Sequence, residues 1–92
     1  MRKNLNVGAR ACIDQFVLNL GVEDRGIALQ YITLPNGQNY ESEFLRLQAQ
    51  YGDKLRKILG QIEVLRKNIN CEYGALERGL QLELERRLPQ QN

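Results

Sequence analysis

The sequence has 92 residues, of which 42% are hydrophobic and 26% are charged. This length allows one small domain, and this balance is too apolar for a disordered chain and too charged for a membrane protein. The sequence contains no His, the commonest general base and metal ligand, and its net charge of +2 does not by itself imply a nucleic-acid or membrane partner.

The N-terminal residues and the two cysteines bear on the compartment. Arg2 and Lys3 are not followed by an apolar segment, so we expect no signal peptide, no membrane span and an intracellular, cytoplasmic protein. Cys12 and Cys71 are too few for a zinc site without His, and no secretory signal favours a disulfide between them. We therefore predict two small buried hydrophobic residues at these positions, and no metal or cofactor.

Residues 8–21 are predicted to form a short amphipathic helix. Its apolar residues recur at helical spacing: Ala9, Cys12, Ile13, Phe16, Val17 and Leu20. The opposite side is polar, and Gly21 supplies a stop signal. A helix of about 13 residues does not persist alone in water, so it needs a partner surface.

Residues 27–42 are predicted to form a small β element. The segment 27–34 is rich in β-branched and aromatic residues, which favour a strand. The sequence Pro35-Asn36-Gly37 is a strong turn signal, and it would join this strand to a second strand at 38–42 in a hairpin. The same turn could instead connect a strand, or a second short helix, to the residues that follow.

The dominant pattern of the sequence is an apolar seam over residues 40–88. Its members follow one another at steps of three or four residues, about 3.7 on average, which matches the 3.6 residues per turn of an α-helix. The seam consists of Phe44, Leu47, Tyr51, Leu55, Ile58, Ile62, Leu65, Ile69, Tyr73, Leu76, Leu80, Leu84 and Leu88. It is widened by Leu45, Leu59, Val64 and Leu82, so we predict contact with more than one neighbour.

Four glycines interrupt the seam, and Pro89 ends it. The favoured break is at Gly52, where glycine can end one helix and Asp53 can cap the next. Because the seam keeps its phase across all four glycines, we predict one long helix up to residue 88, or successive helices in phase.

The predicted fold is therefore mostly α, in a single small domain. Residues 1–39 form a helix and a β or turn element, residues 40–88 form a long helical oligomerisation region, and residues 89–92 form a tail. The first of these regions is too short to cover a seam of roughly 54–73 Å, so we expect a dimeric helical bundle or coiled coil. The predicted oligomer interface consists of Phe44, Tyr51, Leu55, Ile58, Ile62, Leu65, Ile69, Tyr73, Leu76, Leu80 and Leu84.

These features favour a non-enzymatic, homo-oligomeric scaffold or adaptor, such as a small regulatory factor that binds another protein. Catalysis is not expected, because a cysteine nucleophile would lack an imidazole base. Tyr31 and Tyr40, beside Glu41 and Glu43, form a candidate surface for a basic partner. The alternative for both tyrosines is that they pack on the long helix.

The alternative function is a dimeric, nucleic-acid-binding regulator. Its candidate phosphate contacts are the basic residues Lys54, Arg56, Lys57, Arg66 and Lys67, or the N-terminal helix. A solvated helix face explains the same charges, because Glu63 and Lys67 have the spacing and order of a helical ion pair.

Overall fold

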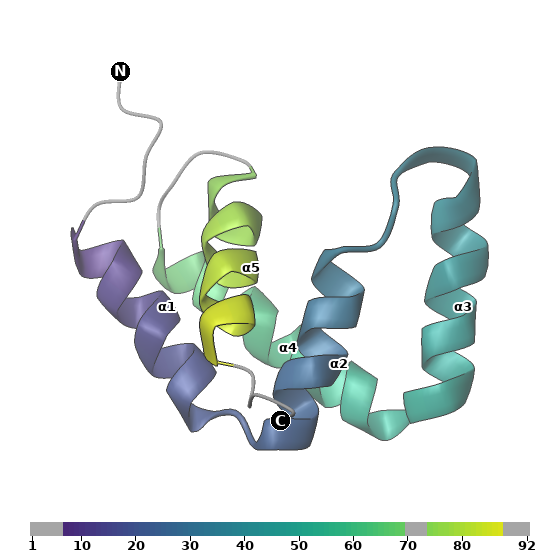
Figure 1. Cartoon of the computed structure of the whole chain (residues 1–92), viewed down its shortest axis with the longest axis horizontal. Coiled ribbons are helices and arrows are strands. Elements are labelled where there is room, and N and C mark those ends of the chain that lie inside the picture. The colour runs from purple at the N-terminus through teal and green to yellow at the C-terminus, as the bar shows by residue number, and fades with distance from the viewer. Residues whose placement is uncertain (1–6, 70–73, 88–92) are drawn as a thin grey trace.

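The computed structural model describes residues 7–69 and 74–87, and these residues form five α-helices and one 3₁₀ turn (Figure 1). The elements in chain order are α1 (Val7–Asn19), α2 (Val22–Ile32), η1 (Gly37–Asn39), α3 (Tyr40–Tyr51), α4 (Asp53–Asn68) and α5 (Ala75–Arg87). The prediction of a mostly α fold is confirmed. No helix within the described ranges has both the length and the hydropathy that a bilayer crossing requires.

The N-terminal helix is confirmed, with bounds close to those predicted. Helix α1 buries Ala9, Ile13 and Val17, which lie on one face at helical spacing. Phe16 is only half-buried and lies on a neighbouring face, and Val7 and Leu18 are exposed. Helix α1 therefore has two apolar faces, one in the core and one beside it.

The predicted β element is wrong, because residues 22–32 form helix α2 and the described residues contain no strand. Glu23 and Asp24 lie in the first turn, where acidic side chains favour a helix through its dipole. Ile27 and Ala28 are buried against other helices, and the Thr33 hydroxyl donates to the Leu29 carbonyl at 2.7 Å. Burial on a helical surface thus outweighs the strand preference of the individual residues.

Of the two alternatives for residues 40–88, the single long helix is wrong and successive helices are found, because the seam is divided among α3, α4 and α5. The first break is at Gly52, the position favoured from the sequence, with φ +54° and ψ −120°, but Gly52 is itself the N-cap of α4 and Asp53 is not. The second lies between Asn68 and Ala75, where Ile69 is extended and Gly74 has φ +90°. The residues predicted as a tail, 89–92, lie outside the described residues.

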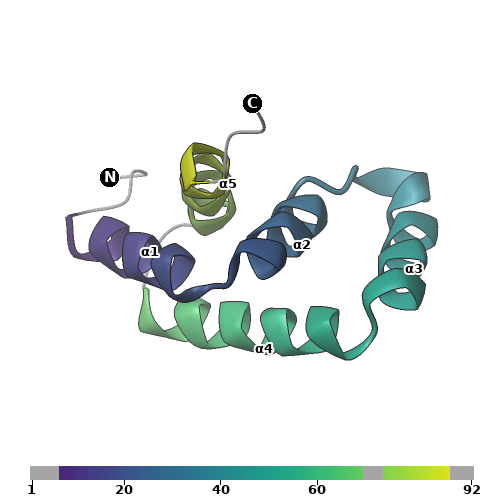
Figure 2. The ribbon, with the colours of Figure 1, turned by 60° about the horizontal axis from the view of Figure 1, so that its bottom comes forward.

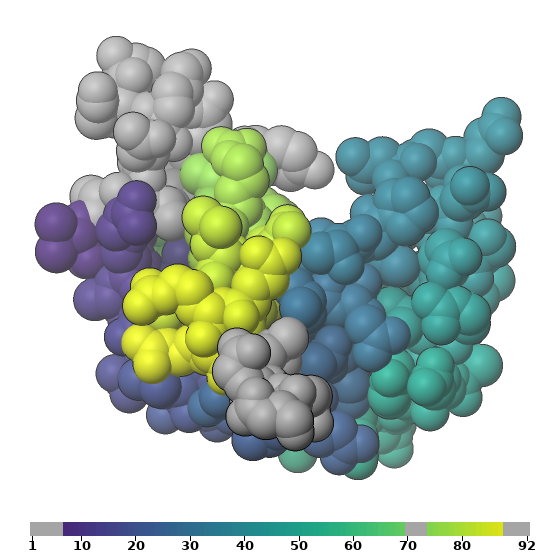
Figure 3. Space-filling model, viewed as in Figure 1, coloured from purple at the N-terminus to yellow at the C-terminus, as the bar shows by residue number. Residues whose placement is uncertain are grey.

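Helices α1 and α2 lie between α4 and α5 (Figure 2). The core contains apolar residues from all five helices, and those with less than 2% of their surface exposed are Val17, Ile27, Ala28, Leu47, Leu55, Ile58, Leu76, Leu80 and Leu84. The described residues of the seam are thus buried or half-buried within one chain, and the reason for expecting a second copy along them no longer holds. Helix α3 stands at one edge of the molecule, away from α1 and α5 (Figure 3).

Arg25 joins the C-terminal ends of α1 and α5. Its Nε donates to the carbonyls of Val17 at 3.1 Å and Leu20 at 3.2 Å, and its Nη1 donates to the carbonyl of Arg87 at 3.0 Å. These carbonyls lie at helix C-terminal ends, where the helix dipole is negative, and the Val17 carbonyl also accepts from the Leu20 amide at 3.1 Å. One guanidinium therefore binds at both helix ends.

Asp14 forms a second link between α1 and α5. Arg87 donates from Nη2 to the Asp14 carboxylate at 2.6 Å, and from Nε to Glu83 at 2.8 Å. A hydrogen bond with the Glu83 side chain and the charge of Arg87 lower the pKa of Asp14 below its usual value, although burial acts in the opposite direction.

Candidate functional site

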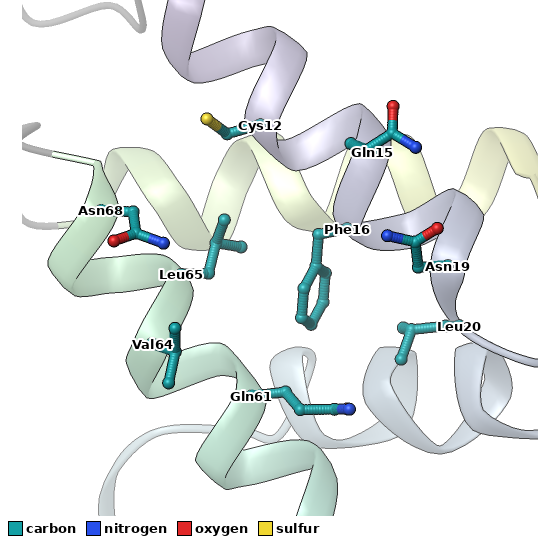
Figure 4. Close-up of a pocket in the computed structure, with 9 residues that line it drawn as sticks. All are labelled: Cys12, Gln15, Phe16, Asn19, Leu20, Gln61, Val64, Leu65 and Asn68. Atoms are coloured by element: carbon teal, nitrogen blue, oxygen red, sulfur yellow. The ribbon is translucent and has the colours of Figure 1, made fainter.

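A groove of about 440 Å³ lies between α1 and α4 (Figure 4). Helix α1 contributes five of its lining residues, Cys12, Gln15, Phe16, Asn19 and Leu20, counting the residue just after its end. Helix α4 contributes Gln61, Val64, Leu65 and Asn68. The volume falls in the usual range for ligand sites, roughly 300–1,000 Å³.

The centre of the groove is apolar. The Phe16 ring extends from α1 into the space between the two helices (Figure 4) and is half-buried. Leu20 and Leu65 are buried at its sides, whereas Val64 is 58% exposed on the α4 side. An aliphatic side chain of a ligand would contact all four residues, and it would remove the Val64 surface from water.

Four side-chain amides surround this apolar centre: Gln15, Asn19, Gln61 and Asn68. Each amide offers both donors and an acceptor. None of them makes a side-chain hydrogen bond to another residue in the described ranges. No lining residue is an acid or a base with a full charge at neutral pH, so the groove fits an uncharged surface that carries hydrogen-bonding groups.

Cys12 lies at one end of the groove and is exposed with a free thiol. The prediction that Cys12 is buried is therefore wrong, and Cys71 lies outside the described residues. Cys12 is the only lining residue with a titratable side chain, and the groove brings no general base to it.

The predicted oligomer interface lies mostly inside the chain. Eight of its residues are buried in the core: Leu55, Ile58, Ile62, Leu65, Ile69, Leu76, Leu80 and Leu84. Phe44 and Tyr51 are half-buried and pack against that core, and Tyr73 lies outside the described residues. These residues stabilise one copy of the protein, and self-association through them stays a prediction.

The two predicted surface tyrosines meet on Phe44 of α3. Tyr31 contacts the Phe44 ring edge-on with centroids 6.2 Å apart, and Tyr40 stacks on it at 6.1 Å. Burial and a hydrogen bond with Tyr40 raise the pKa of Tyr31 to about 12. Tyr40 remains 38% exposed and Glu41 is exposed, whereas Glu43 pairs with Arg46 at 2.8 Å. The tyrosines therefore hold α3 in place and leave only part of the candidate surface free.

Most of the predicted phosphate contacts are already paired with carboxylates. Three ion pairs, at 2.5 to 3.4 Å, join Lys54 to Glu23, Arg56 to Asp53 and Arg66 to Glu77. Lys57 and Lys67 are exposed, and neither has an ion pair within the described residues. The structure therefore does not gather the five basic side chains into one uncompensated patch.

Sequence reasoning missed the groove but contained a signal for it. The helix at 8–21 has Phe16 beside the face of Ile13 and Val17, and Val64 widens the seam of the later helix. Both observations indicate an apolar surface broader than one neighbour covers. What the sequence did not show is that α1 and α4 lie side by side.

The described residues contain no group of three His, Cys, Asp or Glu side chains placed to hold a metal ion. No known protein family, curated protein or solved structure matches the chain.

Proposed function

We propose that the protein is a small cytoplasmic adaptor that binds an amphipathic helix of another protein in the α1–α4 groove. The observation that supports this most directly is an uncharged apolar groove, surrounded by four amides without side-chain partners among the described residues. A helix that inserts an apolar side chain between two packed helices is a recurrent mode of peptide recognition.

The chemistry of the lining favours binding over catalysis. Phe16 and Leu65 offer apolar contact, and the amides offer hydrogen bonds to polar groups beside the inserted side chain. Recognition of this kind depends little on ionic strength because no charged group takes part.

Val64 and Leu82 offer a matched pair of test positions. Both are exposed aliphatic residues in helices, at 58% and 62%, but Val64 lines the groove and Leu82 lies on α5 outside it. Val64→Asp places a carboxylate where the ligand must lose water, which costs binding energy. Leu82→Asp introduces the same charge elsewhere.

The ligand probes are amphipathic helical peptides selected on the wild-type protein from a displayed library. A fluorophore on Cys12, in a Cys71→Ser background, reports occupation of the groove. We expect Val64→Asp to weaken binding at least tenfold, which corresponds to about 1.4 kcal/mol, and Leu82→Asp to leave it unchanged. Equal effects of the two variants, or failure to select any peptide, would contradict the proposal.

The same titration separates the proposal from nucleic-acid binding. Peptide binding in the groove should change less than about twofold between low and high salt, whereas each phosphate contact adds nearly one unit to the salt slope. Tight binding of an oligonucleotide that weakens steeply with salt would favour the alternative function, with Lys57 and Lys67 as its first candidates.

A further inference from the structure

The core of this protein forms between two halves of the chain. The N-terminal half, residues 7–51, contains α1, α2, η1 and α3, and the C-terminal half, residues 53–87, contains α4 and α5. Helices α1 and α2 pack on α5 and on α4, and α3 packs on α4 (Figure 2). Helices α4 and α5, by contrast, have little backbone contact with each other, although the Arg66–Glu77 ion pair joins them. Each half therefore depends on the other for most of its burial.

Polar side chains also join the two halves of the chain. Lys54 pairs with Glu23 at 2.7 Å, and Arg87 pairs with Asp14 at 2.6 Å. Arg25 adds its bond to the Arg87 carbonyl. The surface that complements one half is thus found, in full, only on the other half of the same sequence.

A single residue joins the two halves. Helix α3 ends at Tyr51 and α4 begins at Asp53, so Gly52 alone makes the turn. Its dihedral angles, φ +54° and ψ −120°, are those of the first central residue of a type II′ turn, which glycine adopts and other residues avoid. A Cβ atom built on Gly52 meets no atom within 4 Å, so only the backbone requires glycine there.

The apolar seam runs through this turn without losing its phase. Leu47, Tyr51, Leu55 and Ile58 follow at steps of four, four and three, as they would on one uninterrupted helix. If Gly52 took helical dihedral angles, α3 and α4 would become one helix from residue 40 to residue 68, about 43 Å long. Its seam would continue along one side.

We propose that the protein exchanges halves between two copies, so that Gly52 straightens and the N-terminal half of each chain packs on the C-terminal half of its partner. Domain exchange of this kind is a low-cost route to dimers, because all contacts except those of the hinge are recreated between chains. A short hinge promotes it, because one residue gives the two halves little freedom to adjust to each other within one chain. The occupant of each complementary surface is a second copy of this chain.

The exchange does not depend on the proposed function. The α1–α4 groove is itself formed by one helix from each half, so an exchanged dimer contains two such grooves. An adaptor with one groove would become one with two, which raises its avidity for a partner that carries repeated sites.

The first experiment compares Gly52→Ala with Gly60→Ala. Gly60 lies inside α4, and a Cβ atom there also meets no atom within 4 Å, so both changes add a methyl group to open space. Gly52→Ala is strained in the closed chain and favoured in the continuous helix. Helix propensity alone should shift the equilibrium between the two forms of the hinge by about fivefold towards the helix. We expect Gly52→Ala to lower the dimer dissociation constant by at least about 25-fold, since each dimer has two hinges.

Multi-angle light scattering across a concentration series measures this shift. We expect Gly52→Ala to have twice the mass of the chain at concentrations where wild type and Gly60→Ala are monomeric. A monomeric Gly52→Ala variant that is folded by circular dichroism overturns the proposal. If Gly52→Ala does not fold, a cross-linking experiment on the wild-type protein tests the exchange instead.

That experiment uses the Glu23–Lys54 ion pair as a reporter of exchange. Wild-type chains with ¹⁴N and with ¹⁵N are unfolded together, refolded at high concentration, and treated with a carbodiimide that joins a carboxylate to an amine in contact. Mixed-isotope peptides that link Glu23 to Lys54 in the dimer fraction support exchange, and Glu23→Gln should remove them. A dimer in which this link joins only peptides of one isotope, or no dimer fraction at all, overturns the proposal.

Discussion

Helices α3 and α4 carry consecutive parts of one apolar seam, yet they are buried to very different extents. Helix α4 buries Leu55, Ile58, Ile62 and Leu65, whereas α3 buries only Leu47. The difference arises because α4 lies beneath both α1 and α2, while α3 contacts α2 and α4 at one edge. Apolar periodicity therefore identifies which face of a helix is buried. The number of neighbouring helices determines how many residues of that face are buried.

The contacts that hold α3 are correspondingly few. Phe44 packs between Tyr31 and Tyr40, and the Gln30 amide donates to the Tyr51 hydroxyl at 2.8 Å. By contrast, α1, α2, α4 and α5 form a bundle that shares one core. We therefore expect changes in the bundle to unfold the whole protein and changes in α3 to act locally.

The largest effect is expected in the bundle. Leu84 has no exposed surface, so Leu84→Ala leaves a cavity among α5 and its neighbours and should cost about 2–5 kcal/mol of unfolding free energy. Urea denaturation monitored by circular dichroism measures this loss. If only the amides of α5 lost protection while the remaining helices kept theirs, the bundle would not be one cooperative unit.

A more local effect is expected in α3. Leu47→Ala removes the one fully buried side chain of this helix and should cost about 2 kcal/mol, at the lower end for such a change because the edge can relax. Amide hydrogen exchange should then show faster exchange over α3 and unchanged protection in α5. Leu45→Ala, at a position 53% exposed, is the control and should change neither.

Arg25 links the bundle helices through bonds to backbone carbonyls, and no described side chain holds α3 in this way. Arg25→Met keeps the aliphatic length but removes the donor to the carbonyls of Leu20 and Arg87, whereas the Val17 carbonyl keeps its bond from the Leu20 amide. We expect a loss of about 2 kcal/mol, as for other hydrogen bonds to charged groups. Arg25→Lys keeps the charge but not the planar fork, so it should restore only part of the loss in a thermal melt.

The smallest effect is expected from the titration of Asp14. Because its pKa is lower in the folded protein than its usual value of 3.8, its contribution is present above that value and is lost as the pH falls through the folded pKa. Wild type should therefore lose more stability than Asp14→Asn between about pH 5 and about pH 2. Equal losses, measured as urea midpoints at each pH, would show that Asp14 is not the titrating group.

The sequence predicted which face of each helix is apolar, but it did not predict which helices pack against each other. Helix α1 and the break at Gly52 were predictable because helical spacing and a glycine followed by Asp53 are local signals. Helix α2 was not predictable, because the local sequence of residues 27–34 favours a strand. Burial against α4 and α5 outweighs this preference, and that burial is not visible in the local sequence. The turn after α4 was missed because a seam can keep its phase wherever two successive helices bury the same side. The groove required the position of α1 against α4, which no local pattern contains.

The link between Asp14 and Arg87 spans 73 residues, and this has a consequence for how the protein is made. A ribosome adds about 5–20 residues per second, so α1 waits roughly 4–15 s for the helix that will cover it. During that time Ile13 and Val17, which are buried in the finished protein, have no α5 to pack against. The first helix to be synthesised is therefore among the last to be covered, and its apolar face stays in water until α5 has been made.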